Sequence, residues 1–182
     1  MAVMSQTELS SQVIDVPQPG RYLISPEHSS AVIRTRHLFG LGAVRAALDL
    51  RDGRIEVTGP PQASTVQARF AVPSFHSGNA ARDAAVLSSR LLDAEAFPTI
   101  SFVSTELTQA DRTWTLRGEL EVRGVARLVE ARITALRADG STLTATAQAV
   151  IDRYDFGITA YRGLAARKLT VDLTVTAHRE ES

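Results

Sequence analysis

The segments LTATAQAVI, residues 143–151, and LTVDLTVTA, residues 169–177, alternate apolar with polar side chains at almost every position. Successive side chains of a strand point to opposite faces of a sheet, so this period of two is typical of strands with one buried face. The same alternation recurs in other runs, at residues 65–72, 113–122 and 129–136. The pattern predicts an all-β protein built from antiparallel strands.

Turn signals separate these runs, and Asp139-Gly140 between two of them predicts a hairpin. We expect about eight strands, in which two of the first three form one bent strand or residues 54–57 extend the third. The expected strands cover residues 20–25, 30–38, 43–51, 64–74, 99–107, 113–122, 126–137 and 142–151, with a further one at 168–178. Residues 79–92 break the alternation, and Asn79 before an alanine- and leucine-rich stretch predicts a single helix or helical turn lying across the barrel.

Eight amphipathic strands form either a sandwich or a closed barrel. Closure leaves no edge strand, and an eight-stranded barrel is just wide enough to be filled by side chains or to hold one small ligand. The expected inward set is rich in small residues, namely Ala131, Ala135, Ala145, Ala147 and Ala149. Two interpretations of this surface remain open at this point: the helix packs against it, or it lines a cavity.

Composition excludes several classes of protein. The 182 residues fit one domain, with residues 1–19 as a flexible lead-in and 20–182 as the barrel. Twenty basic residues balance twenty acidic ones, unlike the basic surface of a nucleic-acid binder.

No basic n-region precedes an apolar run near the first residue, and no segment approaches the roughly 18 apolar residues of a spanning helix. We therefore expect no integral membrane segment and a cytoplasmic location.

Catalytic and metal-binding motifs are missing from the sequence. The four histidines, His28, His37, His76 and His178, form no pair at strand or helical spacing, so no metal site is predicted. There is no cysteine, nucleophile elbow or glycine-rich phosphate loop. Arg82-Asp83 in the predicted helix forms either a local surface ion pair or a contact that pins the helix to the barrel. The sequence predicts a protein that is not an enzyme and needs no cofactor.

Several short motifs occur in order through nearly all of residues 20–178. They are Glu27-His28-Ser29 with His37 and Gly40, Ser77-Gly78-Asn79 with Arg82-Asp83 and Ser88, Phe97-Pro98-Thr99-Ile100-Ser101-Phe102 with Ser104-Thr105, Leu116-Arg117-Gly118-Glu119-Leu120 with Arg123-Gly124-Val125, and Asp152-Arg153 with Asp155-Phe156-Gly157-Ile158. With these motifs the chain resembles the YceI-like family of lipocalin-shaped polyisoprenoid-binding proteins. The resemblance implies an eight-stranded antiparallel lipocalin-like barrel, one short helix near its mouth, no cofactor, a long isoprenoid lipid in the lumen, and a possible homodimer.

The resemblance also implies a set of ligand-binding residues. His28, His37, Arg82 and Arg153 are expected at the mouth, where they either bind the ligand or hold the barrel closed. Phe70, Phe102, Ala145, Ala147 and Ala149 are expected around the lipid tail. The sequence departs from the family pattern at three places: Ser25 replaces an aspartate, Ala85 a histidine, and Ala126-Arg127-Leu128 a threonine-lysine-proline. These departures leave tail binding intact and indicate a different head group or a neutral lipid.

Three functional hypotheses follow. The first is binding, storage or transport of a long-chain polyisoprenoid, either a prenyl phosphate or an isoprenoid quinone. The second is an enzyme that acts on such a lipid with a histidine as acid or base, which needs at least two polar groups converging inside the lumen. The third is a filled barrel that serves as a stress-related interaction module, which requires a lumen without a continuous void.

Overall fold

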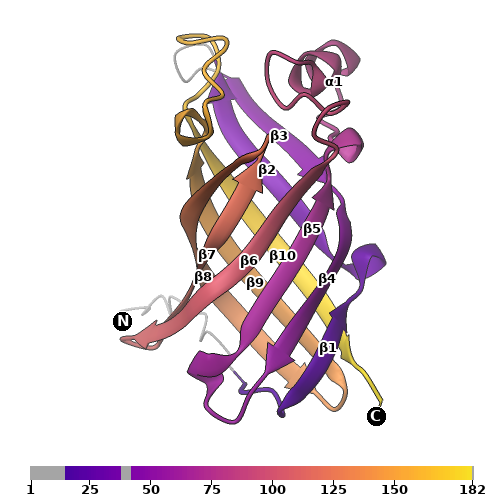
Figure 1. Ribbon diagram of the computed structural model, residues 1–182, viewed down its shortest axis with the longest axis vertical. Helices are drawn as coiled ribbons and strands as arrows, with labels where there is room; N and C mark the ends of the chain where they lie inside the picture. The colour runs from indigo at the N-terminus through magenta and orange to yellow at the C-terminus, as the bar shows by residue number, and fades with distance from the viewer. Residues whose placement is uncertain (1–14, 38–41, 182) are drawn as a thin grey trace, which may run out of the picture.

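A computed structural model describes residues 15–37 and 42–181, and it folds into one antiparallel barrel (Figure 1). Its strand segments are β1 (Gly20–Ile24), β2 (Ser30–His37), β3 (Gly42–Leu48), β4 (Leu50–Val57), β5 (Thr65–Ala71), β6 (Thr99–Ala110), β7 (Thr113–Val122), β8 (Val125–Asp139), β9 (Thr142–Asp152) and β10 (Lys168–Arg179). The pairing of β1 with β10 closes the barrel, which confirms the predicted fold class.

These ten segments occupy eight positions around the barrel, because two strands are interrupted. β1 and β2 lie end to end along the same edge of β10, separated by the 3₁₀ helix Pro26–His28. β3 and β4 continue each other across Asp49, so β2 pairs with β3 and β1 pairs with β4. Both alternatives for the first strands therefore hold: residues 54–57 extend the third predicted strand, and the first two form one broken strand.

The alternation of the sequence is preserved in the barrel wall. β9 and β10 pair continuously from Asp152↔Lys168 to Thr142↔His178, and Asp139-Gly140 closes the predicted β8–β9 hairpin with Gly140 at a φ of 57°. A β-bulge between Ile133 and Ala135 shifts the register of β8, so Leu136 lines the interior where Ala135 was expected. One register shift therefore replaces a small inward residue by a large one.

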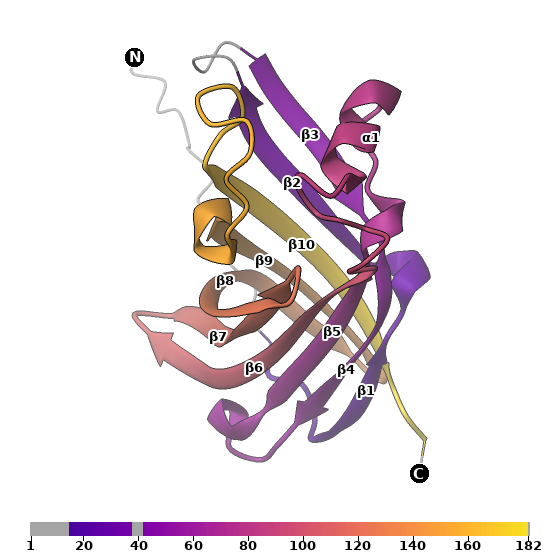
Figure 2. The same ribbon diagram turned by 45° about the horizontal axis from the view of Figure 1, so that its top comes forward.

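The helix α1 (Ala80–Leu87) lies beside one end of the barrel, which we call the helix end (Figures 1 and 2). As predicted, Asn79 caps it by accepting a hydrogen bond from the Arg82 amide at 2.9 Å. The helix is shorter than the expected 79–92, because the Ser88 hydroxyl donates to the Ala85 carbonyl oxygen and Ser88 leaves the helical conformation. The interpretation in which the helix packs against the alanine-lined surface is wrong, because α1 lies at the end of the barrel and the alanines of β9 line a void.

The opposite end of the barrel, where β1 begins and β10 ends, is called the terminal end (Figure 1). Residues 1–14 of the predicted flexible lead-in lie outside the described residues. The remainder contacts the barrel: the Asp15 amide donates to the Leu136 carbonyl oxygen at 3.0 Å, and Tyr22 donates its hydroxyl to the Gln18 carbonyl oxygen. In the described part of the chain, every helix falls short of the length and apolar character needed to cross a bilayer.

Candidate ligand cavity

A continuous cavity of about 760 Å³ fills the inside of the barrel. All ten strand segments contribute inward side chains to its wall, and most of these side chains are aliphatic or aromatic. Among the described residues, the lining side chains that carry a charge or a hydroxyl group are Thr35, Ser64, Arg82, Arg153 and Tyr161. The third hypothesis, a barrel filled by its own side chains, is contradicted by this void.

The cavity is wide because β9 presents small side chains to it. Ala145, Ala147 and Ala149 follow one another along the wall, and Phe70 and Phe102 line it from β5 and β6. A Cβ atom at Gly118 would meet the Phe102 ring at 2.5 Å, so this glycine leaves the space that the ring occupies. The structure thus places all five predicted tail residues around one lumen, while their contact with a lipid stays a prediction.

Arg153 is buried at the helix end, with 6% of its surface exposed. Its Nε donates to the Ala166 carbonyl oxygen at 2.8 Å, and its Nη1 donates to those of Ile158 and Ala160, also at 2.8 Å. Its Nη2 donates to the Ala165 carbonyl oxygen at 3.3 Å. Burial lowers the pKa of the guanidinium from its ordinary value. Since backbone carbonyls take up most of its donors, Arg153 holds the loop of residues 157–167 over the cavity.

Arg82 lies in the first turn of α1 and also lines the cavity. The predicted pair with Asp83 is replaced by a contact of Arg82 Nη1 with Ser77 Oγ at 3.4 Å. Asp83 accepts hydrogen bonds from the hydroxyl and the amide of Ser77, and His76 Nδ1 lies 3.5 Å from its other oxygen. These bonds lower the pKa of the Asp83 carboxyl. Asp83 therefore ties the helix to the preceding loop, and Arg82 reaches toward the lumen.

Of the two histidines expected at the mouth, the structure describes the side chain of His28 alone. His28 is exposed in the 3₁₀ helix between β1 and β2, where its Nδ1 lies 2.9 Å from Ser25 Oγ. The structure places it outside the lumen wall. His37 ends β2, but its side chain lies outside what the structure describes. Motif position identified these residues, and it carries no information on which face of the chain they occupy.

Sequence reasoning missed three polar residues of the wall, Thr35, Ser64 and Tyr161. Thr35 continues the inward set Ala31 and Ile33 of β2, so strict alternation would have found it. Tyr161 lies in the loop 157–167 at a φ of 59°, with the Arg90 guanidinium 4.9 Å from its ring centre. An irregular loop has no periodicity from which to predict the direction of a side chain.

The geometry around Asp83 bears on the enzyme hypothesis. A serine nucleophile needs a histidine between its hydroxyl and the carboxylate, so that the imidazole can take the proton. Here the carboxylate of Asp83 lies between Ser77 and His76, and His76 is exposed. Among the described residues, no three histidine, aspartate or glutamate side chains gather as metal ligands. This arrangement makes Asp83 a structural anchor.

These features define a class: an antiparallel barrel of eight strand positions around an apolar lumen, with its charged lining residues at one end. A family model described as the YceI-like domain matches residues 22–178, and the chain belongs to this family. Two relatives from strains of Pseudomonas putida, both called UPF0312 protein, are 29% identical over 122 residues. That match covers 64% of this chain and 62% of each relative, so it spans less than two thirds of their length.

Solved structures of low sequence identity share the fold. BcnA from Burkholderia cenocepacia superposes with a TM-score of 0.76 at 17% identity, covering 84% of this chain and 98% of that one. A polyisoprenoid-binding domain from Saccharophagus degradans gives 0.65 at 10% identity, covering 90% and 100%. The YceI protein of Campylobacter jejuni gives 0.57 at 17% identity, covering 74% and 85%. At these identities the likeness establishes the architecture.

Proposed function

We propose that this protein binds one long-chain polyisoprenoid lipid inside its barrel. The observation that carries the proposal is the continuous apolar lumen of about 760 Å³. At roughly 30 Å³ per molecule, about 25 water molecules would fill this volume, and those at the wall would need polar partners from it. The wall offers few such partners along most of its length, so an apolar chain is the occupant that its chemistry favours.

The tail supplies the affinity in this proposal. Burial of about 500 Å² of apolar lipid surface contributes about 12 kcal/mol at roughly 25 cal/mol per Å², before the costs of association and ordering. A hydrogen bond at the head group adds about 1–3 kcal/mol. Chain length and branching therefore determine how tightly a lipid binds, and the polar groups determine which way it points.

The head group is expected at the helix end, where Arg82, Arg153 and Tyr161 enter the wall. Because Arg153 already donates to four backbone carbonyls, Arg82 is the cation that we assign to the head group. Ala85, where the family pattern has a histidine, lines the same region with a methyl group. One arginine beside an apolar surface suits the carbonyl of an isoprenoid quinone as well as a prenyl phosphate.

Organic extraction of purified protein followed by mass spectrometry tests the proposal. We expect close to one prenyl lipid per chain, and its mass separates a quinone from a phosphate. The matched variant is Ala147→Trp, since its indole would fill the middle of the lumen while the outer face of β9 stays unchanged. This variant should keep its circular dichroism spectrum and yield no lipid. Wild-type protein that is empty and takes up no prenyl probe would overturn the proposal.

Storage and transport are the two uses of such a site. Transport requires release of the lipid to acceptor vesicles, whereas storage requires retention of it, and a vesicle transfer assay separates them.

The cytoplasmic location and the homodimer stay predictions, which fractionation and sedimentation of the full chain can test. The second hypothesis, an enzyme acting on the bound lipid, predicts a chemically altered lipid after incubation, which the same mass spectrum would detect.

A further inference from the structure

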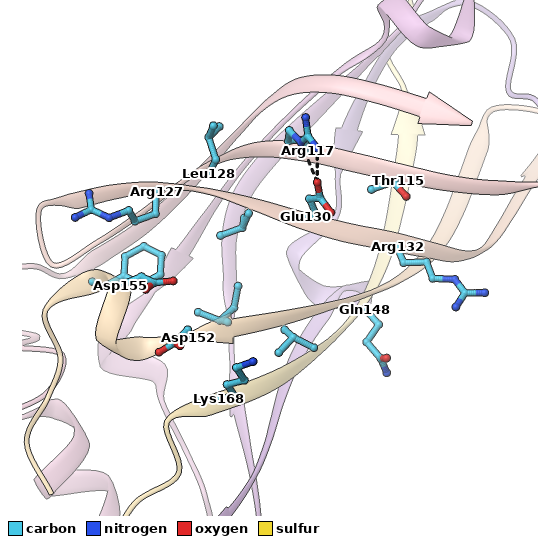
Figure 3. A pocket seen from close by; sticks show the side chains of 14 residues that line it. Thr115, Arg117, Arg127, Leu128, Glu130, Arg132, Gln148, Asp152, Asp155 and Lys168 are labelled. Carbon is cyan, nitrogen blue, oxygen red and sulfur yellow. Dashed lines mark hydrogen bonds and ion pairs between the residues drawn. The ribbon is translucent and has the colours of Figure 1, made fainter. Parts of the chain in front are cut away.

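The barrel wall separates along one line, between β8 and β9. Their pairing runs from Asp139↔Thr142 to Ala131↔Ala149. Beyond that point β8 continues through residues 125–130 beside β7, while β9 continues through 150–152 beside β10. Figure 3 shows the two strands diverging, with Arg127 and Glu130 on one side and Asp152 on the other. In this described part of the wall, no pairing joins β8 to β9.

A groove of about 860 Å³ lies on the outer surface over this separation. Val129, Ile151 and Phe156 line the groove, and the same three residues also line the lumen. One layer of apolar side chains thus separates the outside of the barrel from its interior. Phe156 comes from the 3₁₀ helix Arg153–Phe156, and not from either strand, and only 3% of its surface is exposed.

The rim of the groove combines apolar and charged side chains. Leu128 and Val150 project outward from the two separated strands and are 68% and 59% exposed. Charged side chains of both signs line the groove as well (Figure 3): Arg117, Arg127, Arg132 and Lys168 are basic, and Glu130, Asp152 and Asp155 are acidic. Exposed aliphatic side chains beside a thin apolar wall suit the passage of a hydrocarbon chain.

We propose that the lipid enters and leaves the lumen sideways, through a portal between β8 and β9 that Phe156 closes. This inference rests on the proposed lipid-binding function and adds the route to it. Because Phe156 belongs to a short helix, it can move without breaking a strand pair. A hydrocarbon chain would then slide between Val129 and Ile151 and remain in contact with apolar side chains throughout.

Cross-linking tests the route, since the chain has no cysteine and introduced thiols react alone. In the portal variant, Leu128→Cys and Val150→Cys are bridged by a bismaleimide after loading with dansylated geranylgeraniol. In the control variant, Arg137→Cys and Thr144→Cys bridge the same strands where they are paired. Release of the probe to phosphatidylcholine vesicles is followed by fluorescence, before and after bridging.

We expect bridging at Leu128 and Val150 to slow release about tenfold or more, and bridging at Arg137 and Thr144 to leave the rate unchanged. Equal rates before and after bridging of the portal variant would overturn the portal while leaving lipid binding intact. Slowing by both bridges to the same degree would overturn it too. Wild-type protein that takes up no probe at equilibrium would overturn the proposed function, and the portal with it.

A second measurement uses matched substitutions at the two possible exits. Phe156→Leu shortens the residue that closes the portal, and Phe75→Leu makes the same change in the lining at the helix end. We expect Phe156→Leu to speed release severalfold and Phe75→Leu to leave it within about twofold of wild type. The reverse result, faster release only from Phe75→Leu, would place the exit at the helix end and overturn the portal.

Discussion

The two ends of the barrel are built in different ways. At the terminal end, the buried cluster consists of strand residues only: Tyr22, Ile24, Leu50, Ile55, Val57, Ala68, Leu143 and Ala177. At the helix end, the buried cluster is Val122, Phe156 and Ile158, of which only Val122 belongs to a strand. Leu91 and Leu92, from the stretch after α1, pack against this second cluster together with partly buried strand residues, namely Ile100, Leu120, Val125, Val129 and Ile151.

Because of this difference, the terminal end contributes mainly to the stability of the barrel, whereas the segments at the helix end can move in the folded protein. A strand residue cannot move without breaking a ladder of hydrogen bonds, so the terminal end opens only when the barrel unfolds. Residues in loops and short helices can move while every strand pair persists. At the helix end the connecting segments are instead held by single side chains: Arg153 holds the loop 157–167, and Arg123 donates to the Leu91 carbonyl oxygen at 3.0 Å.

The largest effect is expected for Tyr22→Ala at the terminal end. Tyr22 is 1% exposed, and its ring lies in the larger cluster. Loss of a buried aromatic ring lowers the free energy of unfolding by about 4 kcal/mol, which urea denaturation measures. Tyr22→Phe removes only the hydrogen bond to Gln18 and should cost about 1 kcal/mol. A loss below that of Tyr22→Phe would contradict the comparison.

A smaller and local effect is expected for Arg153→Met at the helix end. The substitution leaves the carbonyls of Ile158, Ala160, Ala165 and Ala166 without their donor, at a cost of about 2 kcal/mol. The loop 157–167 should loosen while the barrel persists, so trypsin should cleave after the exposed Arg162 faster than in wild type. Arg153→Lys, which keeps the charge and three donors, should be intermediate. Unchanged cleavage in both variants would show that the loop holds itself.

The smallest effect concerns pH at the start of α1. The Ser77 hydroxyl bonds to Asp83 and lowers the pKa of that carboxyl below its ordinary value of 3.8. Since the folded pKa lies below the unfolded one, the contact stabilises the protein above pH 3.8 and is lost as the pH falls through the folded pKa. The Ser77 amide, which donates to Asp83 at 3.0 Å, should report this titration by NMR with a midpoint below 3.8.

The matched control for this titration is Asp83→Asn, in which the Ser77 amide shift should stay flat through the same pH range. His76 also faces Asp83, at 3.5 Å, and the positive charge of its imidazolium lowers the pKa of Asp83 further. His76→Gln should therefore raise the midpoint while leaving it below 3.8. A midpoint of 3.8 or higher in wild type would mean that the helix is not anchored by this carboxylate.

The sequence predicted the barrel because side chains along each strand alternate between the inner and the outer face. Ala145, Ala147 and Ala149 were assigned correctly to the inner face from their spacing alone. Where the backbone departs from regular pairing, the prediction failed: the bulge at Ile133/Ala135 reversed Ala135, and the helix ended at Leu87 instead of Leu92. The bulge depends on how β8 pairs with β9, and the helix end depends on the side-chain hydrogen bond of Ser88, and the spacing of apolar residues encodes neither.

The candidate site was less predictable, because three of its features depend on loop conformation and on the extent of strand pairing, which residue spacing does not encode. Arg153 was expected either to face a ligand or to hold the barrel closed, and only the folded loop 157–167 shows that its donors go to backbone carbonyls. His28 was expected at the mouth and lies on the outer surface beside Ser25. The groove between β8 and β9 follows from where their pairing stops, at Ala131 and Ala149.

The sequence by itself determined an antiparallel barrel with an apolar inner face, since alternation along each strand fixes the side on which a residue lies. Only the tertiary structure decided what that face encloses. Closure of β1 on β10 leaves a lumen of about 760 Å³, and the loss of pairing beyond Ala131↔Ala149 thins its wall at one place. Volume and openings depend on how strands curve around one another, which is a property of the closed barrel and not of any single strand.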